Sequence, residues 1–164
     1  MSNWLAAIYT LVASTFLGMS VAVACATSHE TAMFDVAGLK SELMVTALTC
    51  NADSQYNAFV SRFRTILLVD DRELQGYFQH TYGGAGQAAH DAYITNVANK
   101  MSELGVSEGN DFCRRHLVLF SEVLGLDRVA DLALFAASRG YVEPIAPPSC
   151  TMIAADPRQG AGRR

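Results

Sequence analysis

Two histidines and an aspartate lie near one another in the middle of the chain, around a glycine-rich stretch. His80 and His90 flank the sequence "TYGGAGQAA", Asp91 follows His90, and several tyrosines are close by. Imidazole and carboxylate groups bind metal ions and carry out acid–base catalysis. Two helices that meet at this stretch would bring the imidazoles together. The alternative is structural: a helix end favours His80 through the dipole, and His90 lies on a solvated face. We favour this alternative, because the pair lacks the third ligand of a zinc site.

The glycine-rich stretch also contains the pattern Gly-x-Gly-x-x-Ala, at Gly84, Gly86 and Ala89. In a dinucleotide-binding fold this pattern follows a strand and opens a helix, so that free backbone N–H groups face the pyrophosphate. Here the preceding residues have helical spacing and no second strand follows, so the context of a nucleotide site is missing. We interpret Gly83 and Gly84 as the end of one helix and Gly86 as the start of the next, and we predict no bound cofactor.

Two other groups of residues carry reactive side chains. Cys113 and His116 are one helical turn apart, but a covalent haem motif needs a second cysteine, and Cys113 lies on an apolar helix face, which favours a disulfide. Asp70, Asp71 and Glu73 form a charge run typical of a solvated face or a helix start. The sequence contains no Gly-x-Ser-x-Gly elbow, His-Glu-x-x-His pair or phosphate-binding loop. It therefore predicts no catalytic residue.

The chain has four cysteines, Cys25, Cys50, Cys113 and Cys150, and no two of them are close in sequence. Such spacing in an exported chain favours disulfides over a zinc site, because structural zinc sites draw on close pairs. Four cysteines allow three connectivities. We favour Cys50 with Cys113, because both fall on predicted helix faces among core residues, and Cys25 with Cys150 joining the two ends. Lipidation of Cys25 at the weak lipobox "AVAC" is an alternative, and it would leave Cys150 unpaired.

The front of the chain is apolar and uncharged. Residues 1–29 contain no Asp, Glu, Lys or Arg, and the apolar run Leu5–Val23 is followed by small residues. This pattern is typical of a secretory signal peptide over residues 1–26, and it predicts a periplasmic or secreted protein. Because "MSNW" carries no basic residue, an uncleaved membrane anchor stays open as an alternative, since about 20 apolar residues can span a bilayer.

Composition limits the remaining possibilities. The 164 residues are 51% apolar and 17% charged, with a net charge of −4. Without the signal segment, the chain suits one domain with a single modest core. The only basic clusters are Arg114-Arg115 and Arg163-Arg164. Nucleic acid binding needs a concentrated basic patch, so the sequence predicts no nucleic acid partner.

Apolar residues recur with helical spacing over residues 34–140. We predict an all-α, single compact domain of five or six helices, over about 36–50, 54–82, 86–104, 107–124 and 127–139. The second of these is either one long helix or two with a kink near Val69. All four prolines fall in residues 141–164, which we predict to be an extended tail that is disordered towards its end.

Several segments between residues 38 and 140 carry a family resemblance: "LKSELMVTALTC", "YNAFVSRFR", "YGGAGQAAHDAYITNVAN" and a later "FC". On these segments the chain resembles a group of small exported alphaproteobacterial proteins of unknown function. Some of them carry the name S-adenosyl-L-homocysteine hydrolase, which does not fit, because that enzyme is a large NAD-dependent α/β protein. The resemblance implies export, a helical core and a disulfide through Cys50 and Cys113. It carries over no catalytic residue.

These observations favour an exported, disulfide-stapled helical module that is not an enzyme and binds a protein partner in the periplasm or at the envelope. The alternative is a small-molecule or metal-binding protein, with or without hydrolytic activity, that uses His80, His90 and Asp91. Contact with a membrane is expected only if the N-terminal segment is retained or Cys25 is lipidated.

Overall fold

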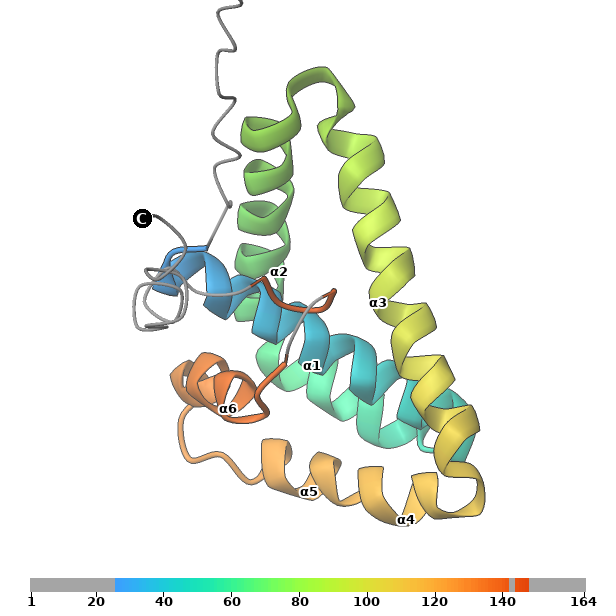
Figure 1. Cartoon of the computed structure of the whole chain (residues 1–164). Helices are drawn as coiled ribbons and strands as arrows, with labels where there is room; N and C mark the ends of the chain where they lie inside the picture. Colours follow the sequence, from blue (N-terminus) through green and yellow to red (C-terminus); the bar gives the residue numbers. More distant parts are fainter. Residues whose placement is uncertain (1–25, 142–143, 148–164) are drawn as a thin grey trace, which may run out of the picture.

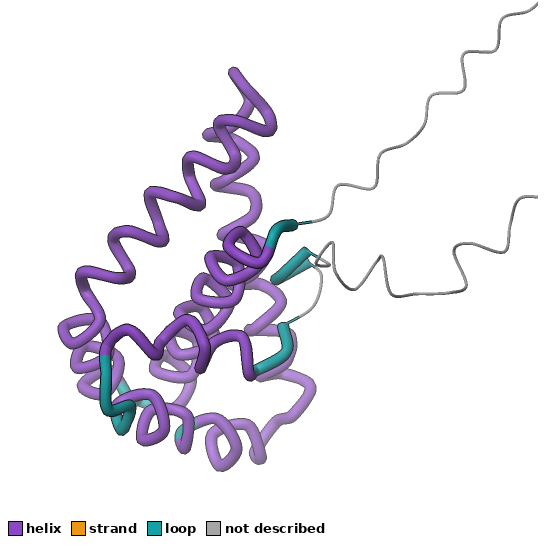
Figure 2. Tube along the Cα trace, turned by 90° about the vertical axis from the view of Figure 1, so that its left-hand side faces the viewer, coloured by secondary structure: helices purple, strands orange, loops and turns teal. Residues whose placement is uncertain are grey.

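The computed structural model describes residues 26–141 and 144–147, and in these ranges the chain is helical without a β-strand. This confirms the predicted all-α domain. Figures 1 and 2 show the helices from two directions, joined by short loops. The described residues form six α-helices: α1 (Ser28–Cys50), α2 (Asp53–Tyr82), α3 (Gly86–Glu108), α4 (Phe112–His116), α5 (Val118–Leu124) and α6 (Leu132–Ser138).

Helix α1 crosses the middle of the molecule, with α2, α3 and α6 packed around it (Figure 1). It begins well before the predicted residue 36, because Thr27 and Glu30 form a capping box. The Thr27 N–H donates to Oε2 of Glu30 at 2.8 Å, and the Glu30 N–H donates to Oγ1 of Thr27 at 3.3 Å. These two bonds satisfy backbone groups that a helix N-terminus leaves free. The helix ends at Asn51, whose backbone is left-handed with φ of 56°.

Helix α2 is one unbroken helix of 30 residues, as in the first predicted alternative, and not two separate helices. Figure 1 shows that it nevertheless changes direction near its middle. Its first half lies along α1, and its second half rises from the bundle beside the first half of α3. Three helices therefore meet at a junction where α1, the middle of α2 and α3 face one another.

The predicted glycine turn between two helices is confirmed. Gly83 ends α2 with φ of 53°, a short 3-10 turn follows, and α3 begins at Gly86. Gly86 is buried, and a Cβ atom there would lie 2.7 Å from Cα of Gln79 and 2.8 Å from the carbonyl oxygen of Phe78. The two helices approach so closely that a side chain does not fit. No strand delivers these glycines, because the residues on both sides are helical.

The predicted helix start at Ser107 is wrong. Helix α3 continues through Glu108, and the chain breaks at Gly109, where φ is 55°. Gly105, the predicted helix end, remains inside α3, where the ring of Phe112 lies 3.7 Å from the position of a Cβ atom. Positive φ is cheapest at glycine, and Gly109 is the glycine that takes this role. A further break at Leu117 separates α4 from α5.

The main core lies between α1, α2, α5 and α6. Its fully buried side chains include Leu39, Leu43, Phe59, Phe63, Phe120 and Leu132. A disulfide between Cys50 and Cys113 joins the end of α1 to α4, with Cα atoms 5.6 Å apart, which confirms the predicted pairing. Cys25, Cys150 and the predicted signal peptide lie outside the described residues. None of the helices in the described ranges is both long and apolar enough to span a bilayer.

The start of the predicted tail packs on the helices. Ile145 and Ala146 are buried, and the Tyr93 hydroxyl donates to the carbonyl oxygen of Ile145 at 2.6 Å. Gly38 of α1 makes room for this segment, because a Cβ atom there would lie 2.6 Å from Cγ2 of Ile145. The contact at Ile145 thus holds the chain against α1 and α3 after α6.

Candidate functional site

A pocket lies at the junction of α1, α2 and α3, with an empty volume of about 590 Å³ that includes the solvent at its mouth. Each helix contributes residues at spacings of three and four, so each presents one face to the pocket. These residues are Met33, Val36, Ala37, Lys40, Ser41 and Met44 from α1, Leu67, Asp70, Asp71 and Leu74 from α2, and Ile94, Val97 and Ala98 from α3. The lining is mainly apolar.

Small side chains keep the pocket open. Ala37 and Ser41 face it from α1, and Ala98 faces it from α3, at positions where larger residues would fill the space between the helices. Met33 and Met44 also line it, and the unbranched methionine side chain adapts its shape to a neighbour. The pocket therefore combines a fixed helical frame with adjustable walls.

Two polar atoms in this apolar pocket have no hydrogen-bond partner among the described residues: Oδ2 of Asp70 and Oγ of Ser41, both buried. Burial raises the pKa of Asp70 from its ordinary value of 3.8 to about 6, the nearby Glu73 adds to the increase, and His29 opposes it. At pH 7 the carboxylate still predominates by about tenfold. Buried polar groups in proteins are normally hydrogen-bonded, so these two atoms mark a place where a ligand would supply the missing partners.

The mouth of the pocket carries one ion pair. Nζ of Lys40 lies 3.6 Å from Oδ1 of Asp71, and both side chains are about half exposed. The ammonium group of Lys40 thus pairs with Asp71, which is next to Asp70 in the sequence. Asp71 is exposed, as predicted for a solvated charge run. Asp70 differs from the prediction, because its Oδ2 atom is buried in the pocket.

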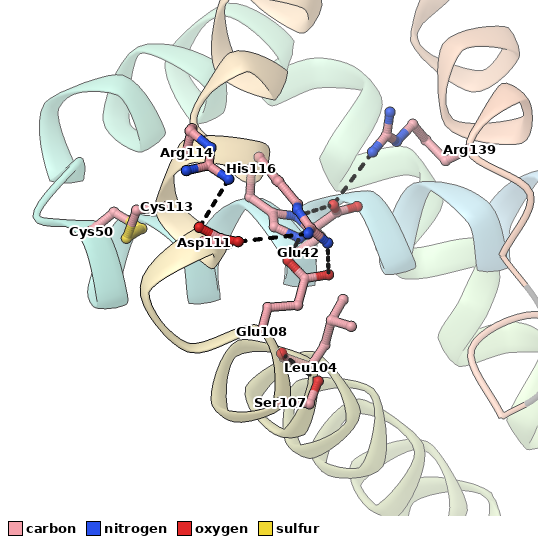
Figure 3. Close-up of polar contacts among 11 residues, drawn as sticks. Glu42, Cys50, Leu104, Ser107, Glu108, Asp111, Cys113, Arg114, His116 and Arg139 are labelled. Carbon is pink, nitrogen blue, oxygen red and sulfur yellow. Dashed lines mark hydrogen bonds and ion pairs between the residues drawn. A yellow bond between two sulfur atoms is a disulfide. The ribbon is translucent and has the colours of Figure 1, made fainter.

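A second polar cluster surrounds His116 (Figure 3). Its Nδ1 lies 2.8 Å from Oε1 of Glu42, and its Nε2 lies 3.3 Å from Oε2 of Glu108. Arg139 approaches Oε1 of Glu42 at 3.5 Å, and the Tyr141 hydroxyl donates to Oε2 of the same residue. Glu42 and His116 are both buried. Each imidazole nitrogen of His116 therefore faces a carboxylate.

The groups around His116 could in principle transfer protons, but they face one another rather than a space for a substrate. No member of the cluster lines the pocket between α1, α2 and α3. Phe112 covers one face of the imidazole, with ring centres 4.3 Å apart. Burial raises the pKa of Tyr141, and the carboxylate of Glu42 adds to the increase. The cluster joins α1, α3, α4 and the segment after α6, and we assign it a structural role.

Cys113 and His116, which are one turn apart in the sequence, have separate structural roles on α4. Cys113 is in the disulfide with Cys50, and His116 points to the carboxylates of Glu42 and Glu108 (Figure 3). The prediction that Cys113 forms a disulfide is therefore confirmed.

The two histidines beside the glycine turn lie in different surroundings. His80 is exposed in the last turn of α2, which is the predicted structural position. His90 is not on a solvated face as predicted: its ring packs edge-on against Phe78, with centres 5.7 Å apart, and both ring nitrogens are buried. Asp91 lies 3.5 Å from Nδ1 of His90 and accepts a hydrogen bond from Gln87. No hydrogen bond joins the two imidazoles in the described residues.

The described part of the chain contains no group of three or more His, Cys, Asp or Glu side chains placed to hold a metal ion. Sequence reasoning missed Asp70 and Glu42 as buried acids, although a signal was present for both. Asp70 lies between Leu67 and Leu74 at spacings of three and four, and Glu42 lies in the same way between Leu39 and Thr46. A charged residue inside an apolar helix stripe is unusual and points to a buried partner or a site.

Comparison with known proteins adds no further assignment. No protein-family model, no curated protein and no solved structure matches this chain. The resemblance to small exported alphaproteobacterial proteins therefore stays an expectation from the sequence, and the function has to be argued from the pocket.

Proposed function

We propose that the chain is an exported helical binding module that holds a small, mainly apolar molecule in the pocket between α1, α2 and α3. The observation that carries this proposal is the pocket itself, in which an apolar lining surrounds two buried oxygen atoms without hydrogen-bond partners. Ligand sites in proteins have this composition: apolar walls and a few polar groups that orient the ligand. The site differs from the predicted alternative at His80, His90 and Asp91.

Export is supported by the disulfide and by the front of the chain. Disulfides persist in oxidising compartments and are rare where thiols are kept reduced. The bond between Cys50 and Cys113 closes a long loop, and residues 1–29 have the uncharged, apolar character of a signal segment. Neither feature requires chemistry by the protein, and the buried cluster around His116 has a structural explanation. A binding role fits these features better than catalysis.

Export is tested by expressing the full coding sequence in a bacterium, separating the cell fractions and measuring the intact mass with and without thiol alkylation. We expect a periplasmic protein that has lost about the first 26 residues and in which Cys50 and Cys113 resist alkylation. A cytosolic protein of full encoded mass with reduced cysteines would contradict export. A diacylglyceryl group on Cys25 would show that the protein is a lipoprotein instead.

Binding is tested by NMR of protein labelled at the methionine methyl groups, with hexanol as an apolar probe. We expect the resonances of Met33 and Met44 to shift, because both line the pocket, and that of Met101 to stay, because it is buried elsewhere. The variant Ala98→Phe should fill the pocket and remove the shifts. The matched variant Ala88→Phe, on an exposed position of the same helix, should keep them. Equal shifts in both variants would contradict this site.

A further inference from the structure

Asp70 sets the chemistry of the pocket. Asp70 is half-buried, and its Oδ2 atom is enclosed in the mainly apolar pocket without a hydrogen-bond partner in the described residues. An ionised carboxylate in such surroundings is unfavourable unless a cation or several donors approach it. Burial raises the pKa of this carboxyl group to about 6, so the charged form still predominates at pH 7. The unmatched group is therefore an anion.

The other charges near the pocket leave this anion uncompensated. Three charged residues line the pocket: Asp70 and Asp71 contribute −2, Lys40 contributes +1, and the sum is −1. Lys40 pairs with Asp71 at the mouth. Helix α3 contributes only Ile94, Val97 and Ala98 to the lining. Outside the lining, Glu73 and His29 act on Asp70 in opposite directions. A negatively charged ligand would be repelled, and a positively charged one would supply the missing charge.

The hydroxyl of Ser41 adds a second acceptor. Its Oγ atom is buried without a partner and lines the same pocket from α1. An alkylammonium group carries three N–H donors and no acceptor. It therefore suits a site whose free polar atoms are a carboxylate oxygen and a hydroxyl oxygen. A hydroxyl ligand could pair with both atoms but would bring no positive charge, and a carboxylate ligand would place a second negative charge beside Asp70.

We propose that the ligand is a cationic amphiphile, a primary amine on a short apolar body, whose ammonium group pairs with Asp70 while its apolar part lies against Met33, Met44 and Leu67. This inference rests on the proposed binding function and names its ligand class. The pocket opens to solvent at its mouth, so it suits a short chain, and about six carbons serve as the probe length.

The test uses three probes of equal chain length: hexylammonium, hexanol and hexanoate. Calorimetric titration at pH 7.5 into the protein expressed from its full coding sequence should show hexylammonium binding about tenfold more tightly than hexanol, and no binding of hexanoate. If hexanol or hexanoate binds as tightly as hexylammonium, the binding function stands and the amine assignment is overturned. If none of the three binds, the binding function fails together with this assignment.

A variant pair separates the role of Asp70 from an effect of net charge. Asp70→Asn should reduce the affinity for hexylammonium to about that for hexanol, and should leave hexanol binding unchanged. Asp53→Asn removes the same charge from an exposed position in the first turn of α2 and should leave both affinities unchanged. Asp70→Asn removes a charge from an apolar site, so we expect it to fold with an unchanged or higher thermal midpoint. Equal loss in both variants would overturn the assignment.

Discussion

Individual buried polar groups account for much of what distinguishes this chain from a plain helical bundle, and His116, paired with Glu42, is one of them. Breaking a buried ion pair leaves an unpaired charge and costs about 3 kcal/mol or more, whereas replacing both partners with apolar residues costs less. We therefore expect His116→Leu and Glu42→Leu each to lower the free energy of unfolding by about 3 kcal/mol. The double variant should lose clearly less than the sum. Urea unfolding of the four proteins measures this coupling.

The control for this cycle is an exposed ion pair between Arg114 of α4 and Asp111, which lies just before that helix. Nη2 of Arg114 lies 2.9 Å from Oδ1 of Asp111, but both side chains are open to solvent. Exposed pairs contribute about 0 to 1 kcal/mol, so Arg114→Ala should have a small effect. If His116→Leu and Glu42→Leu were additive, the imidazole and the carboxylate would not be coupled, and the structural role of the cluster would be wrong.

Asp35 gives the protein a predictable pH dependence. It is buried in α1, and burial raises the pKa of its carboxyl group from 3.8 to about 6. Because the folded-state pKa is the higher one, the folded protein binds the proton more tightly than the unfolded chain. The stability linked to that proton is complete below about pH 4 and is lost as pH rises through 6. Burial also raises the pKa of Asp70, so the stability linked to its proton is likewise lost as pH rises through about 6.

Asp35→Asn tests this linkage. The variant removes the titrating group, so its unfolding free energy should come close to that of the parent protein at pH 4 and exceed it at pH 7.5 by about 3 kcal/mol, the free energy that a rise in pKa from 3.8 to about 6 represents. Chemical denaturation at the two pH values measures the difference. A variant that is less stable than the parent at pH 7.5 would show that the Asp35 carboxylate makes a favourable contact that outweighs its burial.

Among the helices, the tight turn between α2 and α3 depends on one glycine more than on the others. A Cβ atom at Gly86 would meet backbone atoms of Phe78 and Gln79 at less than 3.0 Å, and backbone cannot move aside as a side chain can. We expect Gly86→Ala to lower the free energy of unfolding by about 2 kcal/mol. Gly84→Ala should have almost no effect, because the space around Gly84 is open. Thermal unfolding of the two variants makes the comparison, and equal midpoints would contradict it.

Helices and their order were predictable from the sequence, because apolar spacing and glycines are local signals. The start of α1 also has a signal in the sequence, Thr27 and Glu30 at capping-box spacing, next to the predicted signal segment. The end of α3 was not predictable in the same way. Gly105 and Gly109 are both good helix ends, and no local signal in the sequence distinguishes them.

The candidate site was less predictable than the helices, because it depends on which helices face one another. Asp70 and Asp71 are neighbours in a charged run, and only the packing of α1 and α3 against α2 makes one of them buried. The contact of Tyr141 with Glu42 joins residues 99 positions apart. Nothing in the sequence around Tyr141, "RGYVEP", indicates that Glu42 is its partner. Cys50 and Cys113 could be paired from the sequence because cysteine itself indicates a disulfide.

At the scale of the whole molecule, the disulfide ties together the parts that form the pocket. Cys50 ends α1 and Cys113 lies in α4, so the loop that they close contains all of α2 and α3. Two walls of the pocket thus belong to a closed loop, and the third wall, α1, leads directly into it. Because cross-linking restricts the unfolded chain more for longer loops, a bond with a sequence separation of 63 residues has a large effect on unfolding.

Replacing the disulfide should therefore weaken the fold as a whole. We expect the double variant Cys50→Ala, Cys113→Ala to lose about 3 to 4 kcal/mol of unfolding free energy relative to the oxidised protein. Guanidinium unfolding with and without a reductant measures this loss. The reductant should lower the unfolding free energy of the parent protein at least to that of the double variant. Any further loss when the reductant acts on the double variant would come from a second disulfide, the one predicted between Cys25 and Cys150, which can form only if cleavage of the signal segment leaves Cys25 in the chain. If the double variant were as stable as the parent, the disulfide would contribute nothing to the fold, and its support for an exported protein would be lost.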